Sequence, residues 1–209
     1  MKFSQEFKAA ISDLPSAEKD KLIFRLLKKD ENLANRIYFE LLDINTVEDR
    51  RMMIEAEMLK FINTHANRFY SPGYLLVDTR YESGKISQHV KITKDKFGEP
   101  YLNLILLINT LKKNEFNLNA STFGKSYTFN IYVVARVYKI LMQIQLQPQD
   151  LHLEFRDLLN ELGSLFGKFP FLMKVSINNQ LDPNWLLSGE IPEDIVNLQK
   201  ELRAMGFLK

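Results

Sequence analysis

Hydrophobic residues recur every three to four positions along most of the chain, which is the spacing of one face of an α-helix. The longest such stretch, Tyr127–Leu146, is apolar around most of its circumference. Its polar residues Arg136, Lys139 and Gln143 fall on one narrow stripe. Strands usually have about four to eight residues, so the length of this stretch predicts a nearly buried central helix.

A membrane span is the alternative interpretation of the same stretch. Arg136 and Lys139 lie near its middle, and each would cost roughly 2.5–3.5 kcal/mol at the centre of a bilayer. We therefore expect a helix in the core of a soluble protein, with no membrane association.

The same spacing predicts an all-α fold of about nine helices, packed around residues 127–146 and 101–111. The other helices are expected at residues 3–12, 16–27, 33–41, 46–69, 148–166 and 171–180, after residue 72 and from residue 192 onward. Thr46 and Asp49 resemble a capping box, and Ser71-Pro72 is a helix start signal. The polar, glycine-containing segment 114–126 is expected to be the longest loop.

The first three helices are short and amphipathic, and the connections between them have only a few residues, so we expect antiparallel helical hairpins. The apolar stripe of the second helix is expected to be buried and consists of Leu22, Ile23, Leu26 and Leu27. The length of the chain predicts a single helical domain over residues 1–209, with residues 1–70 as a candidate N-terminal subdomain.

Composition excludes several classes of site. The chain has no cysteine, so it has no disulfides, thiolate metal ligands or cysteine nucleophile. The formal net charge of +2 gives no global field that would attract nucleic acid or a membrane. The N-terminal residues lack the apolar core of a signal peptide, so we expect a cytoplasmic protein.

No complete catalytic motif is present in the sequence. Gly124-Lys125-Ser126 supplies the end of a phosphate-binding loop, but Asn119 stands where the earlier glycine is required. A G-x-S-x-G nucleophile elbow is absent. The three histidines are far apart in sequence and are expected to be solvent-facing or locally hydrogen-bonded: His65, His89 and His152.

Four carboxylates on the helix after Pro148 are the best candidate for catalysis. Asp150, Glu154, Asp157 and Glu161 recur at intervals of four, three and four, so they would share one ridge. Such a ridge could hold Mg²⁺ if a neighbouring helix supplied further oxygens, as in all-helical nucleotide pyrophosphohydrolases. The alternative is a solvated helix flank, in which case no cofactor is expected.

Basic residues form two loose groups, at 19–29 and around 85–96, and acidic residues are interspersed with both. A phosphate-binding surface requires several basic side chains to converge. We therefore expect a mixed solvated surface and no nucleic-acid partner.

A segment near the C-terminus, LDPNWLLSGE at Leu181–Glu190, resembles the tail of phage-repressor-type helix-turn-helix domains. That resemblance implies DNA binding near Trp185. The glycine-turned helix pair that enters the major groove in such domains should lie upstream, whereas 151–169 is predicted to be one uninterrupted amphipathic helix. The alternative is that Trp185 anchors a tight turn to the core.

More broadly, the chain resembles a group of uncharacterised all-helical bacterial proteins of similar length. The segments that carry the resemblance are LPSAEKDKLIFRLLKKD (14–30), FYSPGYLL (69–76), HVKITKDKFGE (89–99) and WLLSGEIPEDIV (185–196). Some members of that group carry a dUTP nucleotidohydrolase label. The usual trimeric enzyme of that name is rich in β-structure, so only a helical, Mg²⁺-dependent nucleotide hydrolase would be compatible with this chain, and it would use the four carboxylates above. The resemblance itself places the protein in the group without assigning it a chemistry.

The leading hypothesis is a non-enzymatic protein-interaction module, which binds a protein partner or self-associates through helix faces. Its basis is the absence of a complete catalytic motif beside abundant aromatic residues. Tyr70, Tyr74, Tyr81 and Tyr101 surround the middle helices, where an exposed apolar patch would mark an interface. The nucleotide hydrolase and the DNA-binding protein remain the alternatives.

Overall fold

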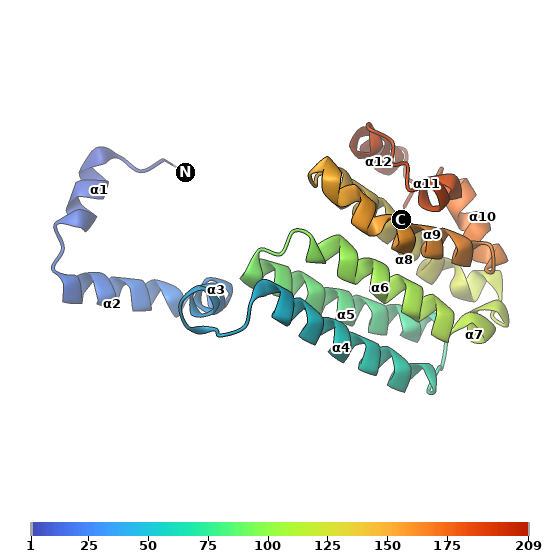
Figure 1. The fold of residues 1–209 in the computed structure, drawn as a ribbon, viewed down its shortest axis with the longest axis horizontal. Coiled ribbons are helices and arrows are strands. Elements are labelled where there is room, and N and C mark those ends of the chain that lie inside the picture. Colours follow the sequence, from blue (N-terminus) through green and yellow to red (C-terminus); the bar gives the residue numbers. More distant parts are fainter. Residues whose placement is uncertain (1, 209) are drawn as a thin grey trace. The chain divides into compact units, whose positions relative to one another are not determined.

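The computed structural model describes residues 2–208, and over these residues the regular structure is entirely helical (Figure 1). The all-α prediction is therefore confirmed. The elements are α1 (Gln5–Ser12), α2 (Ser16–Leu27), α3 (Glu31–Leu42), α4 (Val47–Ala66), α5 (Pro72–Thr93), α6 (Gly98–Lys113), α7 (Glu115–Asn119), α8 (Phe123–Gln145), a 3₁₀ helix (Gln149–Phe155), α9 (Arg156–Phe166), α10 (Pro170–Asn178), α11 (Pro183–Ser188) and α12 (Ile195–Ala204).

The chain divides into two compact units. The first, called here the N-terminal unit, runs to Ile44 and includes Lys91–Thr93. The second, the helical core unit, comprises Asn45–Val90 and the residues from Lys94 onward. Every buried hydrophobic residue of the described chain belongs to the helical core unit.

The predicted central helix is α8. Residues such as Val133, Val137 and Tyr138 are fully buried, because α6, α10 and α12 all pack against α8. α6 also packs against α4 and α9, so α6 and α8 together form the centre of the helical core unit. This arrangement agrees with the continuous apolar surface that both segments show in the sequence.

The prediction of a long loop at residues 114–126 was wrong. The segment contains α7 and the first turn of α8. Its serines donate to backbone carbonyls four residues earlier, as Ser121 does to Asn117 and Ser126 to Thr122. Leu118 is buried in the core. Tertiary packing and local hydrogen bonds therefore outweigh the polar composition.

The prediction of one uninterrupted helix over residues 151–169 was also wrong. Residues 149–155 form a 3₁₀ helix, and the α-helix begins at Arg156. The tighter segment buries Phe155, whose ring centroid lies 4.8 Å from that of Phe97, and leaves Leu153 exposed. Because a 3₁₀ helix has about three residues per turn, the 3.6-residue spacing does not extend through this segment.

Asp95 joins α4 to the turn between α5 and α6. Its carboxylate accepts hydrogen bonds from Arg51 Nε at 2.7 Å and Arg51 Nη2 at 2.9 Å. It also accepts from the backbone N–H of Gly98 at 2.8 Å, and His89 Nε2 lies 3.2 Å away. A Cβ at position 98 would overlap this carboxylate, so the turn requires glycine there. Burial alone would raise the pKa of Asp95, but the hydrogen bonds from His89, Arg51 and Gly98 lower it to about 2.

Candidate interaction surface

The N-terminal unit exposes the apolar faces of its helices. None of the residues in α1, α2 and α3 is buried. The predicted burial of the 16–27 stripe was therefore wrong. The large hydrophobic side chains exposed on these helices and beside them are Phe3, Phe7, Ile11, Ile23, Phe24, Leu26, Leu33, Tyr38, Leu41, Leu42 and Ile44.

Local signals rather than burial define these helices. Ser4 caps α1 by accepting a hydrogen bond from the N–H of Phe7, and Asp30 caps α3 by accepting from the N–H of Leu33. Caps of this kind satisfy backbone groups that a helix end otherwise leaves without a partner. These helices contain no buried residue, so the N-terminal unit has no core of its own that would stabilise their apolar faces.

The segments that contain the second and third helices, together with the residues that flank them, carry opposite charge. Residues 16–29 contain five basic and two acidic residues, a net charge of +3, and residues 30–43 contain one basic and four acidic residues, a net charge of −3. α2 and α3 contact each other. The N-terminal unit therefore combines exposed apolar area with two charged segments that are mutually complementary.

A second apolar surface runs along α5. Tyr70, Tyr74, Val77 and Tyr81 are each more than half exposed. Positions 74, 77 and 81 share one helix face by their spacing, and the rings of Tyr70 and Tyr74 meet edge to face at 4.9 Å. Tyr101, predicted to belong to this group, is instead half-buried and stacked on Phe97 at 5.9 Å.

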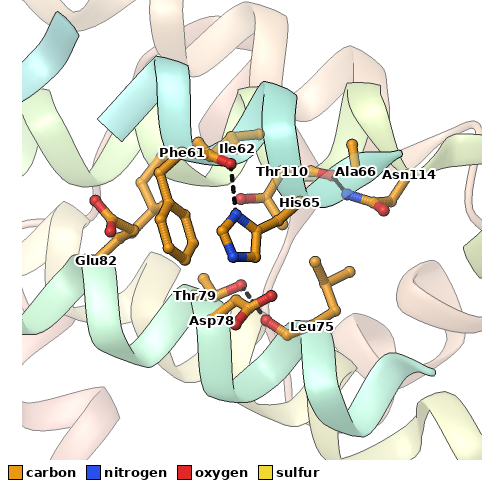
Figure 2. Close-up of a pocket in the computed structure, with 11 residues that line it drawn as sticks. Phe61, Ile62, His65, Ala66, Leu75, Asp78, Thr79, Glu82, Thr110 and Asn114 are labelled. Carbon is orange, nitrogen blue, oxygen red and sulfur yellow. Dashed lines mark hydrogen bonds between the residues drawn. The ribbon is translucent and has the colours of Figure 1, made fainter. Parts of the chain in front are cut away.

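A small cavity lies between α4, α5 and α6 (Figure 2). Its volume is about 20 Å³, which is room for one buried water molecule and too little for an organic substrate. Figure 2 shows the His65 imidazole between Phe61 and the side chains of Asp78 and Thr79.

Polar groups of this cavity are mostly satisfied within the protein. The imidazole Nδ1 of His65 lies 3.0 Å from the Phe61 carbonyl, and Lys85 forms a 2.9 Å ion pair with buried Glu82. This ion pair raises the pKa of Lys85. Asn114 donates to Thr110, but its Oδ1 is buried without a hydrogen bond in the described chain. The cavity is therefore suited to a hydrogen-bond donor of the size of water.

The four predicted carboxylates do not form a site with one another. Asp150 and Glu154 are exposed on the 3₁₀ helix, and Asp157 is exposed on α9. Glu161 forms an ion pair with Lys112. Over residues 2–208 there is no group of three or more acidic or histidine side chains arranged to hold a metal ion. The ridge is discontinuous because its first half is not α-helical.

The segment that resembles a repressor tail packs against the core. α11 lies on α9, Leu186 is fully buried, and the Trp185 ring meets the Tyr138 ring edge to face at 6.5 Å. α9 and α11 approach closely at Gly163, where an added Cβ would lie 2.9 Å from the Leu186 Cβ.

The histidines were expected to face solvent or to be hydrogen-bonded locally, and sequence reasoning missed the burial of His89. His89 is buried, with its Nε2 beside the Asp95 carboxylate. His65 borders the cavity, and it follows the expectation because its Nδ1 lies 3.0 Å from the carbonyl of nearby Phe61. His152 follows the expectation, since its Nε2 lies 3.2 Å from the nearby Gln147 carbonyl. The sequence did contain one signal for the burial of His89, because an aspartate follows it six residues later, just after the end of the helix.

Comparisons with models of known protein families, with curated proteins and with solved structures give no match. Over residues 2–208, no helix has the length and apolar character that would be needed to cross a membrane.

Proposed function

We propose that this protein is a non-enzymatic interaction module that self-associates through its N-terminal unit. The observation that carries the proposal is that three consecutive amphipathic helices contain no buried residue. Large contiguous apolar surfaces on soluble proteins usually mark interaction sites.

The exposed area supports an interface of ordinary size. Large apolar side chains that are about half exposed each present on the order of 100 Å² to solvent. The exposed large hydrophobic side chains on and beside α1–α3 therefore present roughly 1,000 Å² of apolar surface to solvent. A stable interface buries about 800 Å² of the surface of each partner. The N-terminal unit alone has enough apolar area.

The charge distribution favours a second copy of this chain as the occupant. In a twofold-symmetric pair, the same surface of each copy meets its counterpart. Placing residues 16–29 of one copy against residues 30–43 of the other pairs +3 with −3 at both symmetry-related positions. Opposite charges across an interface favour encounter and fix its register.

The test is analytical ultracentrifugation of the full-length chain over a range of concentrations. We expect the wild type to dimerise, and Leu26→Glu combined with Leu41→Glu to shift the equilibrium to monomer. Both leucines are more than half exposed, so their substitution does not open a core. The matched control is Phe116→Glu on α7, which also replaces a highly exposed apolar residue but outside the N-terminal unit.

A monomeric wild type at hundreds of micromolar would contradict the proposal. Equal loss of association in the Phe116→Glu control would place the interface elsewhere. Far-UV circular dichroism of each variant should match the wild type at the same oligomeric state.

A further inference from the structure

A groove in the helical core unit, separate from the surfaces above, is lined by α5, α8 and α12. Its cavity volume is about 370 Å³, within the range of small-molecule sites. The residues that matter for its chemistry are Tyr132, Arg136, Lys139, Met142, Gln199 and Arg203. They come from segments separated by about sixty residues of sequence.

Two guanidinium groups share one aromatic ring beside this groove. The Cζ atoms of Arg136 and Arg80 lie 5.3 Å and 5.5 Å from the centroid of the Tyr132 ring. Arg136 Nη2 also donates a hydrogen bond to the Tyr132 hydroxyl at 3.1 Å. Cation–π contacts orient both arginines without neutralising them.

The arginines of the groove have no acidic partner in the described chain. Lys139 pairs with Glu99 at 2.8 Å, so its charge is compensated. No carboxylate forms an ion pair with Arg80, Arg136 or Arg203 within residues 2–208. The groove therefore carries an uncompensated positive charge.

Gln199 adds an uncharged hydrogen-bonding group to the groove. Its side chain lines the groove, and no hydrogen bond joins it to another described residue. The buried side-chain atoms that lack a hydrogen-bond partner belong to other residues of the described chain, so the Gln199 amide is accessible to solvent in the groove. The amide can therefore donate a hydrogen bond to an acceptor on a ligand.

We propose that this groove binds a small molecule that bears a phosphate group, held by Arg136 and Arg203 with the Gln199 amide as an additional donor. Guanidinium groups match the geometry of phosphate oxygens and bind them bidentately. Ala135 and Met142 provide an apolar wall for the rest of the molecule. A small molecule fits better than nucleic acid, because the net charge of the chain is only +2 and the groove has the volume of a small-molecule site.

The test is isothermal titration calorimetry of the full-length protein with inorganic phosphate and with pyrophosphate at low ionic strength. We expect binding of at least one of them. Arg136→Met and Arg203→Met should each weaken it at least tenfold, and Gln199→Leu should weaken it less. The matched control is Lys200→Met, which removes an exposed positive charge next to Gln199 on α12 and should leave binding unchanged.

Absence of binding by the wild type to both anions at millimolar concentration would overturn the proposal. An equal loss in Lys200→Met would also overturn it, because binding would then depend on general charge. Sedimentation with vesicles containing phosphatidic acid, without binding of the free anions, would assign the groove to a lipid surface and refute a soluble ligand. Thermal unfolding of each variant shows whether it is folded, so that a variant that does not fold is not mistaken for one that has lost binding.

Discussion

At the scale of single residues, Asp95 organises more contacts than its place between two helices suggests. It lies where α5 has ended and α6 begins, next to a turn at residues 96 and 97. Arg51 lies forty-four positions away from Asp95, and no local pattern identifies such a partner. Local signals therefore predict where a chain turns, but not which distant side chain stabilises the turn.

The low pKa of Asp95 makes its contribution to stability depend on pH. The pKa is about 2 in the folded protein, against 3.8 for the unperturbed group. The stabilisation by the Asp95 carboxylate is complete above about pH 4 and is lost as the pH falls toward 2. The difference between the folded and the unperturbed pKa corresponds to about 2 kcal/mol of stability. We expect Asp95→Asn to lower the free energy of unfolding by about 2–3 kcal/mol at pH 7 and to reduce its dependence on pH between 4 and 2. Urea unfolding at a series of pH values measures both.

Exposed Asp157 provides the control for this experiment, because Asp157→Asn removes a carboxylate that has no ion pair in the described chain. It should change the free energy of unfolding by less than about 0.5 kcal/mol. If the free energy of unfolding changed with pH in the same way for Asp95→Asn and for the wild type, Asp95 would not be the source of the pH dependence.

At the scale of elements, hydrophobic periodicity predicted most helices, and it was least reliable where it was weak or irregular. The periodicity of 127–146 is long, and α8 agrees with it to within a few residues. Residues 114–126 lack such a pattern, and their helices depend on Leu118 and on serine–carbonyl bonds. The 3₁₀ helix has an apolar pattern that resembles an α-helix, so the acidic ridge was inferred from the wrong geometry.

The contact between α9 and α11 permits a test with two glycines in helices. Gly163→Ala would place a Cβ 2.9 Å from the Leu186 Cβ, and we expect it to destabilise the protein by about 1–3 kcal/mol. Gly84→Ala has open space around the new methyl group and should stabilise by about 0.5–1 kcal/mol. Thermal unfolding of the two variants compares the same chemical change in two environments. Stabilisation by both would contradict the close approach of α9 and α11.

At the scale of the whole molecule, the sequence predicted the helical class but not how burial is distributed along the chain. The amphipathic patterns of α1–α3 resemble those of helices that pack into a core, and only the structure shows that their apolar faces are exposed. Similarly, Arg136 and Arg203 belong to one groove although they lie far apart in sequence. Periodicity shows which face of a helix is apolar, but it does not show what covers that face.

Removal of residues 1–44 should leave a folded protein. All buried hydrophobic residues lie at position 58 or later, so the truncation removes none of the core. We expect the truncated chain to unfold cooperatively, with a midpoint temperature close to that of the wild-type monomer, and to remain monomeric at concentrations where the full chain dimerises. Calorimetry and ultracentrifugation test these outcomes together. Loss of cooperative unfolding would show that the helical core unit depends on the N-terminal unit.

The absence of buried residues from α1, α2 and α3 also makes the folding of these helices depend on protein concentration. These helices have eight, twelve and twelve residues, and isolated helices of such length are marginally stable in water. Under the proposed self-association, formation of the helices and binding of the second copy become one coupled event. The helical fraction of the N-terminal unit then rises with the amount of protein present. The first forty-four residues would thus report the abundance of their own chain, through their resistance to proteases and the slow exchange of their amide hydrogens.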